Sequence, residues 1–426
     1  MRHCGMLVLA ILLLHGSLKN VNVSAQSGFI KSRGVQFILN GSPYYANGFN
    51  AYWLMSVASD PSQRNKVSSI FQEAVSNGLT ISRTWAFSDG GNQPLQSSPG
   101  VYNEQMFQGL DFVIYEARRR GIKLILSLVN NHGDFGGKAQ YVKWAREQGQ
   151  NISSDDDFFT NSVVKGFYRN HINTVLSRRN SINGVEYKSD PTVMAWELMN
   201  EPRCASDSSG NTMQAWITEM ASYLKSIDKE HLLEVGLEGF YGESAPQDKQ
   251  FNLNFKHGTN FITNNQFAEI DFTTIHSYPD QWLQAGANKD SQLSFTSNWI
   301  NTHIQDSQIV LRKPMLVAEF GWNKSRFDTN TRDQLLGSVY SGINSSARRG
   351  GAAAGGIIWQ LLAEGLDSLR DGYETVIREN PSTDGVIVSQ SRSLTQVQQT
   401  LARTRRGNLE KGRSTLQSAV SRKGIY

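Results

Sequence analysis

The chain has 426 residues, of which 39% are hydrophobic and 19% charged, and its formal net charge is +4. The charge is unevenly distributed, because residues 1–25 contribute +2 and residues 403–426 contribute +6, which leaves −4 on residues 26–402. A mildly acidic body argues against nucleic acid as a partner.

The first 25 residues predict a secretory signal peptide. Arg2 precedes the nine-residue apolar run MLVLAILLL, and the small residues Ser24 and Ala25 indicate cleavage after Ala25. The run is shorter than the roughly 20 apolar residues that cross a bilayer, so a signal anchor is the weaker alternative. We therefore expect a secreted mature chain with no membrane contact after cleavage.

Eight apolar, β-rich segments alternate with helical stretches in the rest of the chain. The strand-like segments are residues 44–53, 79–87, 123–129, 192–200, 231–239, 270–278, 314–322 and 354–362. Helical spacing of apolar residues occurs over 64–78, 103–121, 211–228 and 331–350, and the first two stretches close with a glycine. This alternation predicts an α/β protein with a single (β/α)8 TIM barrel.

The predicted barrel covers residues 26–402, since no linker divides this region. Residues 403–426 form a basic tail without a sustained apolar face, and we expect them to be flexible. Weak contact of this tail with an acidic polymer is the alternative. We expect the whole protein to be a monomer.

Cys204 is the one cysteine that remains once Cys4 leaves with the signal peptide, so no internal disulfide can form. A catalytic thiol is conceivable, but no obvious histidine partner lies near Cys204 in sequence. We expect a packed free thiol.

In such a barrel the loops at the C-terminal ends of the strands build the active site. Polar and aromatic residues gather at these ends: Arg83 and Trp85, then NNHGDFGG (130–137), Asn200 with Glu201, His276 with Tyr278, Glu319, and Trp359. Core packing alone does not require this arrangement.

Glu201 and Glu319 end the fourth and seventh strands, so they should face each other across the barrel mouth. Two carboxyl groups about 5–5.5 Å apart suit glycoside hydrolysis with retention of configuration. Glu201 would be the acid/base, with its pKa raised by burial and by the second negative charge. Glu319 would be the nucleophile, kept ionised by Arg83.

Other strand-end residues fit this chemistry. Tyr278 can donate a hydrogen bond to Glu319, and Asn200 can bind a sugar 2-hydroxyl. Trp85 and Trp359 offer flat faces to a pyranose ring. Because strand side chains alternate, the chain must bulge or end near Asn200 for its neighbour Glu201 to face the same site.

Each residue also has a purely structural interpretation. A lone strand-end glutamate is more often an ion-pair partner, Arg83 can pair with Glu197, and His276 can be a satisfied core histidine. The tryptophans Trp85, Trp282 and Trp359 can belong to the core. Only the whole set favours a site. No cluster has metal-ligand spacing, so we expect no metal and no organic cofactor.

Five motifs in order, ISRTWAFSDGG, WELMNEPRC, HSYPDQW, VAEFGW and IIWQLLAEG, resemble those of the plant endo-β-1,4-mannanases of glycoside hydrolase family 5, in clan A. The resemblance covers residues 29–402. It implies a secreted, cell-wall (β/α)8 enzyme that cleaves internal linkages of mannan, glucomannan and galactomannan. Some members of the family also transfer the glycosyl group to a sugar acceptor.

The resemblance implies that Glu201 is the acid/base and Glu319 the nucleophile. It places Trp85, Asn200, Tyr278 and Trp359 at the cleavage subsite, supported by Arg83 and His276, with Trp282 as a further substrate contact. The chain departs from the family pattern at His132, Gly133 and Leu369. We expect these departures to affect substrate affinity rather than the chemistry.

Three alternatives remain open at this point: a β-1,4-glucanase of the same clan, a catalytically silent protein that binds wall polysaccharide, and an enzyme in which transglycosylation dominates. Sequons for N-glycosylation occur at Asn40, Asn151, Asn323 and Asn344.

Overall fold

The computed structural model describes residues 28–242, 245 and 257–423, with side chains up to residue 405. The predicted signal peptide lies outside the described residues, as do the last three residues of the tail. In the described part of the chain, no helix combines the length and the apolar character needed to cross a membrane.

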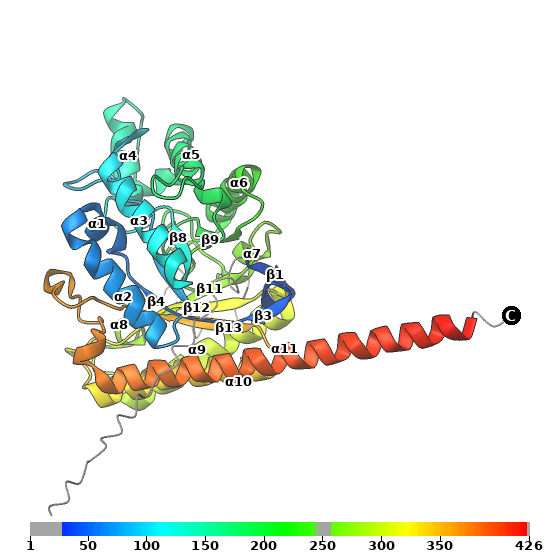
Figure 1. The fold of residues 1–426 in the computed structure, drawn as a ribbon. Helices are drawn as coiled ribbons and strands as arrows, with labels where there is room; N and C mark the ends of the chain where they lie inside the picture. The colour runs from blue at the N-terminus through cyan, green and yellow to red at the C-terminus, as the bar shows by residue number, and fades with distance from the viewer. Residues whose placement is uncertain (1–27, 243–244, 246–256, 424–426) are drawn as a thin grey trace, which may run out of the picture.

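The centre of the molecule is an eight-stranded parallel sheet, nearly closed into a barrel (Figure 1). Its strands are β4 (Ala46–Asn50), β5 (Ile81–Trp85), β8 (Lys123–Ser127), β9 (Val193–Glu197), β10 (Leu232–Glu234), β11 (Thr273–Ser277), β12 (Met315–Phe320) and β13 (Ala353–Ile358). They lie in the order β10-β9-β8-β5-β4-β13-β12-β11. Seven of the predicted segments contain one of these strands each, and the eighth, 354–362, overlaps β13, so the predicted TIM barrel is confirmed.

Helices surround the sheet and alternate with its strands (Figure 1). The α-helices are α1 (Leu54–Ser59), α2 (Arg64–Ser76), α3 (Glu104–Arg120), α4 (Gly137–Glu147), α5 (Ser162–Ser177), α6 (Asn211–Ile227), α7 (Phe261–Gln266), α8 (Pro279–Trp282), α9 (Lys289–Asp306), α10 (Thr329–Arg348) and α11 (Pro381–Lys423). Short turns of helix are η2 (Pro61–Gln63), η3 (Asp155–Phe158), η4 (Tyr187–Ser189), η7 (Ser307–Leu311), η8 (Asp367–Leu369) and η9 (Ile377–Glu379).

Capping residues explain why the bounds of helix α3 follow the sequence pattern. The side chain of Asn103 accepts hydrogen bonds from the backbone N–H groups of Gln105 and Met106, which caps the N-terminus. At the other end Gly121 adopts φ 70°, a left-handed conformation that glycine tolerates best.

A small antiparallel sheet closes the N-terminal end of the barrel. It consists of β1 (Lys31–Arg33), β2 (Gln36–Leu39) and β3 (Ser42–Tyr44), and a separate two-stranded hairpin, β6 (Gln96–Ser98) with β7 (Val101–Tyr102), lies in a loop. Phe37 of β2 packs edge-on against Phe272 at a ring-centroid distance of 5.2 Å. It belongs to a buried cluster with residues from the first halves of several barrel strands, such as Ile81 and Leu316. The open end of the barrel is therefore the C-terminal end.

Helix α11 packs along α10 and then extends beyond the barrel (Figure 1). Ile387 and Leu394 of this helix are buried, and its Ser391 accepts a hydrogen bond from the Asn47 side chain at 2.8 Å. The helix runs without interruption across the predicted tail boundary after residue 402. The flexibility expected of residues 403–426 stays a prediction.

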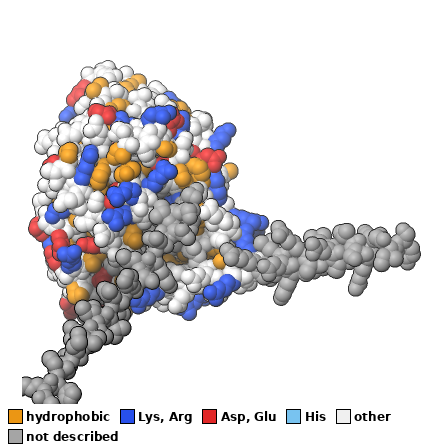
Figure 2. Space-filling model, in the orientation of Figure 1, with side chains coloured by type: hydrophobic (Ala, Val, Ile, Leu, Met, Phe, Trp, Pro, Cys, Tyr) orange, Lys and Arg blue, Asp and Glu red, His pale blue; other side chains and the backbone are white. Residues whose placement is uncertain are grey.

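Basic and acidic side chains are interspersed over much of the face seen in Figure 2.

Candidate active site

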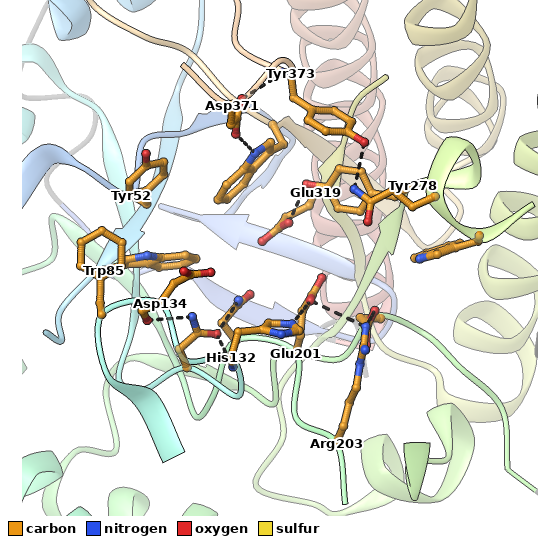
Figure 3. Close-up of a pocket in the computed structure, with 17 residues that line it drawn as sticks. Tyr52, Trp85, His132, Asp134, Glu201, Arg203, Tyr278, Glu319, Asp371 and Tyr373 are labelled. Atoms are coloured by element: carbon orange, nitrogen blue, oxygen red, sulfur yellow. Dashed lines mark hydrogen bonds and ion pairs between the residues drawn. The ribbon is translucent and has the colours of Figure 1, made fainter. Parts of the chain in front are cut away.

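A cavity of about 740 Å³ opens at the C-terminal end of the barrel (Figure 3). Seven residues predicted from the sequence line it: Trp85, Asn200, Glu201, Tyr278, Trp282, Glu319 and Trp359. Arg83 and His276 are fully buried and contact the two glutamates. The structure thus brings every predicted site residue together at one place.

Glu201 and Glu319 point toward each other across this cavity (Figure 3). One carboxylate oxygen of each lies within 4.8 Å of the other and of a ring nitrogen of His276. Strand β9 ends at Glu197, and Glu201 adopts φ 52°. The chain has therefore left the extended conformation, as the sequence required for Asn200 and Glu201 to share one site.

Arg83 is the buried centre of a polar network beneath the cavity. Its Nε and Nη2 atoms lie 2.5 and 2.7 Å from the two carboxylate oxygens of Glu197. Nη1 donates to Glu319 at 2.5 Å and to Asn50 at 3.0 Å, and Nη2 also donates to Asn200 at 2.7 Å. All five N–H donors of the guanidinium therefore have an acceptor. From the sequence, pairing of Arg83 with Glu197 and support of Glu319 by Arg83 were alternatives. In the structure Arg83 does both.

Tyr278 and His276 hydrogen-bond to the two carboxylates. His276 lies on β11, and Tyr278 directly follows this strand. The Tyr278 hydroxyl donates to Oε2 of Glu319 at 2.7 Å, as expected. Nδ1 of His276 lies 2.6 Å from Oε1 of Glu201 and 3.6 Å from Oε2 of Glu319. These hydrogen bonds account for the close approach of Glu201, His276 and Glu319 without a bound ion. The expected absence of a metal stays a prediction.

The electrostatics of the two glutamates differ from the sequence expectation. Burial opposes ionisation of Glu201, but hydrogen bonds from His132 and His276 outweigh burial and hold its pKa well below the ordinary value. For Glu319 burial raises the pKa, against the opposing charges of His276 and Arg83. The predicted rise in the pKa of Glu201 is therefore wrong, because the imidazoles of His276 and of His132, which was not named as a site residue from the sequence, both contact its carboxylate.

Aromatic side chains form one wall of the cavity. Trp359 stacks on Tyr52 with ring centroids 5.8 Å apart and an interplanar angle of 13°, and Trp85 lies 6.1 Å from Trp359. The indole N–H of Trp359 donates to Asp371 at 2.8 Å, which fixes its orientation. Trp282 lines the cavity and also packs on Trp299 of the core, at 5.3 Å.

Several lining residues were not named from the sequence. Tyr52 follows β4 within the predicted strand segment 44–53, so the strand-end rule could have identified it, whereas Asp371 and Tyr373 lie in the loop after β13, where no periodic pattern marks them. Arg203 binds both oxygens of Glu238 at 2.6 and 2.7 Å, and burial raises the pKa of Glu238 to about 7. Glu238 lies at the end of the fifth predicted strand, so the strand-end rule could have identified it.

Known proteins resemble the chain over most of its length. The family described as GH family 5 beta-mannosidase-like matches residues 27–366. The mannan endo-1,4-beta-mannosidase 1 of Oryza sativa subsp. japonica is 57% identical over 417 residues, which cover 96% of each chain. The mannan endo-1,4-beta-mannosidase 7 of Arabidopsis thaliana is 58% identical over 378 residues, or 88% of each chain. The crystal structure of the endo-1,4-beta-mannanase from Rhizomucor miehei superimposes with a TM-score of 0.74 at 31% identity, covering 87% of this chain and 100% of that one.

Proposed function

The chain belongs to the β-mannosidase-like group of glycoside hydrolase family 5, and from that premise we propose that it is a secreted, retaining endo-β-1,4-mannanase. Its substrates are mannan, glucomannan and galactomannan of the cell wall, cleaved at internal linkages. The observation that carries the mechanism is the pair of carboxylates with oxygens within 4.8 Å. This close approach supports a retaining mechanism, in which the two carboxyl groups are about 5–5.5 Å apart, over an inverting one, in which they are about 6.5–9.5 Å apart.

In the first step Glu319 attacks the anomeric carbon while Glu201 gives a proton to the glycosidic oxygen. The bond between the anomeric carbon and that oxygen breaks, the sugar chain on the reducing-end side leaves with the proton, and a mannosyl ester forms on Glu319. Arg83 and Tyr278 align the attacking carboxylate and oppose the rise in its pKa that burial causes, because each donates to one of its oxygens.

In the second step Glu201, now ionised, takes a proton from water. The water oxygen bonds to the anomeric carbon, Glu319 leaves as a carboxylate, and the original configuration is restored. A sugar hydroxyl in place of water gives transglycosylation by the same route.

Side chains in the walls of the cavity bind the polysaccharide. Trp85, Trp282 and Trp359 present apolar faces on which pyranose rings stack. The Asn200 amide is oriented by Arg83 on its oxygen and by Asn130 on its nitrogen, at 2.7 and 3.0 Å. This orientation leaves the second amide hydrogen for the 2-hydroxyl of the bound mannose.

The remaining features of the proposal concern maturation and location. Residues 1–25 direct secretion, the mature protein acts as a monomer in the cell wall without a metal or cofactor, and the basic tail makes at most weak contact with acidic wall polymers. Of the sequons, Asn40 and Asn151 are exposed, which makes both accessible for glycosylation. The amide of Asn344 instead donates to Gln390 at 2.6 Å.

The test is release of reducing ends from glucomannan, galactomannan and carboxymethyl-cellulose by the mature protein, compared with Glu319→Ala. Glu364→Ala, which removes an exposed glutamate outside the cavity lining, is the matched control. We expect cleavage of both mannans by the mature protein and the control, and none by Glu319→Ala. Cleavage of the cellulose alone would favour the glucanase, and mannan binding without cleavage would favour the silent binding protein.

A further inference from the structure

Two imidazoles contact the carboxylate of Glu201, one on each oxygen. Nδ1 of His276 lies 2.6 Å from Oε1. Nε2 of His132 lies 2.7 Å from Oε2 (Figure 3). His276 comes from strand β11, whereas His132 comes from the loop after β8. The mechanism above does not use His132.

The loop backbone fixes the position of His132. Its N–H donates to the side-chain oxygen of Asn130 at 3.2 Å, and the same oxygen accepts from the Asn200 amide. Gly137, at φ 57°, packs so closely that a Cβ there would lie 2.3 Å from the carbonyl oxygen of His132. The backbone of the loop is therefore closely packed at His132, and this packing places the side chain beside Glu201.

The two histidines differ in their access to solvent. The side chain of His276 is 0% exposed, while that of His132 is 39% exposed and lines the cavity. Only His132 of this pair can exchange a proton with water without the barrel opening. His276 is suited to be a permanent donor to Glu201.

We propose that His132 shares the acid proton with Glu201, so that the proton donor of the first step is the His132–Glu201 pair rather than the carboxyl group alone. This inference rests on the proposed function. The proton moves from Nε2 of His132 to Oε2 of Glu201 and then to the glycosidic oxygen as its bond to the anomeric carbon breaks. In the second step the proton taken from water by Glu201 returns to His132, so the cycle closes without a net gain or loss.

Titratable and charged groups from the neighbouring elements surround the His132–Glu201 pair. They are Asp134 on the same loop, Glu201 and Arg203 after β9, Glu238 and His257 after β10, His276 on β11, and Glu319 on β12. The hydrogen bond to Glu201 raises the pKa of His132 above its ordinary value, burial and Arg203 oppose the rise, and Glu238 adds to it. The net effect favours a proton on the pair.

The first test is the pH dependence of kcat/KM for mannopentaose in the mature protein and in His132→Gln, which keeps a side-chain donor but does not titrate. We expect the alkaline limb of the variant to move to lower pH by about one unit, because its proton then rests on Glu201 alone, beside His276. For an aryl mannobioside with a dinitrophenolate leaving group, which needs no acid, kcat/KM should agree within about twofold. Alkaline limbs that coincide on mannopentaose would overturn the inference.

His257→Gln is the matched control. Burial lowers the pKa of His257 to about 4, so this nearby histidine is uncharged throughout the alkaline limb, and it packs on Phe240 at a centroid distance of 4.7 Å outside the cavity lining. Its alkaline limb should coincide with that of the unsubstituted protein. A mature protein inactive on mannopentaose would contradict the proposed function itself, whereas an active protein with unshifted limbs contradicts only the role of His132.

A second readout does not depend on activity. The ring nitrogen signals of His132, assigned by comparison with His132→Gln, should titrate at lower pH in Glu201→Gln than in the unsubstituted protein, because the neighbouring anion is removed. Identical titration in the two proteins would overturn the inference even if the variants lost activity for another reason.

Discussion

The guanidinium of Arg83 lies 2.5 Å from a carboxylate oxygen of Glu319, and both side chains are almost completely buried. Glu197 fixes the position of this contact, because both of its carboxylate oxygens accept hydrogen bonds from the other edge of the Arg83 guanidinium. A charge held in this way does not have to reorganise when the nucleophile reacts.

Arg83→Lys should lower kcat/KM on mannans by roughly 100-fold or more, since an ammonium with three donors cannot replace five fixed contacts. It should also lower Tm, because part of the buried Glu197 interaction is lost. Kinetics and thermal unfolding measure the two effects. Arg178→Lys, in an ion-pair network with Glu104 and Asp111, should lower Tm but leave kcat/KM unchanged. Full activity of Arg83→Lys would contradict the role given to Arg83.

Glu201→Ala should separate substrates by their leaving groups. On mannopentaose kcat/KM should fall by about 10²–10⁴-fold, the usual contribution of a general acid. With the dinitrophenyl mannobioside the glycosyl-enzyme should still form, visible as a burst of phenolate, and azide should accelerate the second step. An equal loss on both substrates would show that Glu201 does not act as the acid.

Tyr278→Phe should move the acid limb of the pH profile to higher pH. The hydroxyl of Tyr278 donates to Glu319 and lowers the pKa of that carboxyl group, so its removal raises the pKa, and more of the nucleophile is protonated at a given acidic pH. The shift is read from kcat/KM on mannopentaose. Tyr373→Phe is the control, because its hydroxyl donates to Asp280 instead and the acid limb should stay in place. An unmoved limb in Tyr278→Phe would contradict this account.

Cys204 should be inert in the folded protein. Its side chain is buried, burial raises the pKa of the thiol, and Sγ lies 3.4 Å from the Ser206 hydroxyl. A thiol reagent should label the mature protein only after unfolding, and Cys204→Ala should retain hydrolysis at the cost of about 1 kcal/mol of unfolding free energy. Loss of hydrolysis in a folded Cys204→Ala protein would revive the thiol nucleophile.

The barrel and the residues at its open end were predictable from the sequence because both signals are local. Each strand is a short apolar segment, and the side chains that follow it must lie at the same end of a parallel barrel. This rule alone predicts that Arg83, Glu201 and Glu319 lie at one site, although Arg83 and Glu319 are more than 200 residues apart in the sequence.

Contacts between loops were not predictable in the same way. His132 and Glu201 meet only because the loops after β8 and β9 adopt particular conformations, with φ 52° at Glu201 and a glycine at position 137 that allows close packing. The pKa of Glu201 depends on that contact, so its direction was wrong when reasoned from burial and charge alone. The small sheet under the barrel and the length of α11 also lacked a clear local signal.

The most direct test of the mechanism is the identity of the residue that carries the sugar. The mature protein is incubated with a 2-deoxy-2-fluoro mannobioside bearing a dinitrophenolate leaving group, digested with pepsin, and its peptides are sequenced by mass spectrometry. The account predicts a single added fluoromannobiosyl group on Glu319, in the segment VAEFGW. A label on Glu201 instead, or an unlabelled enzyme that hydrolyses mannan to products of inverted configuration, would contradict it.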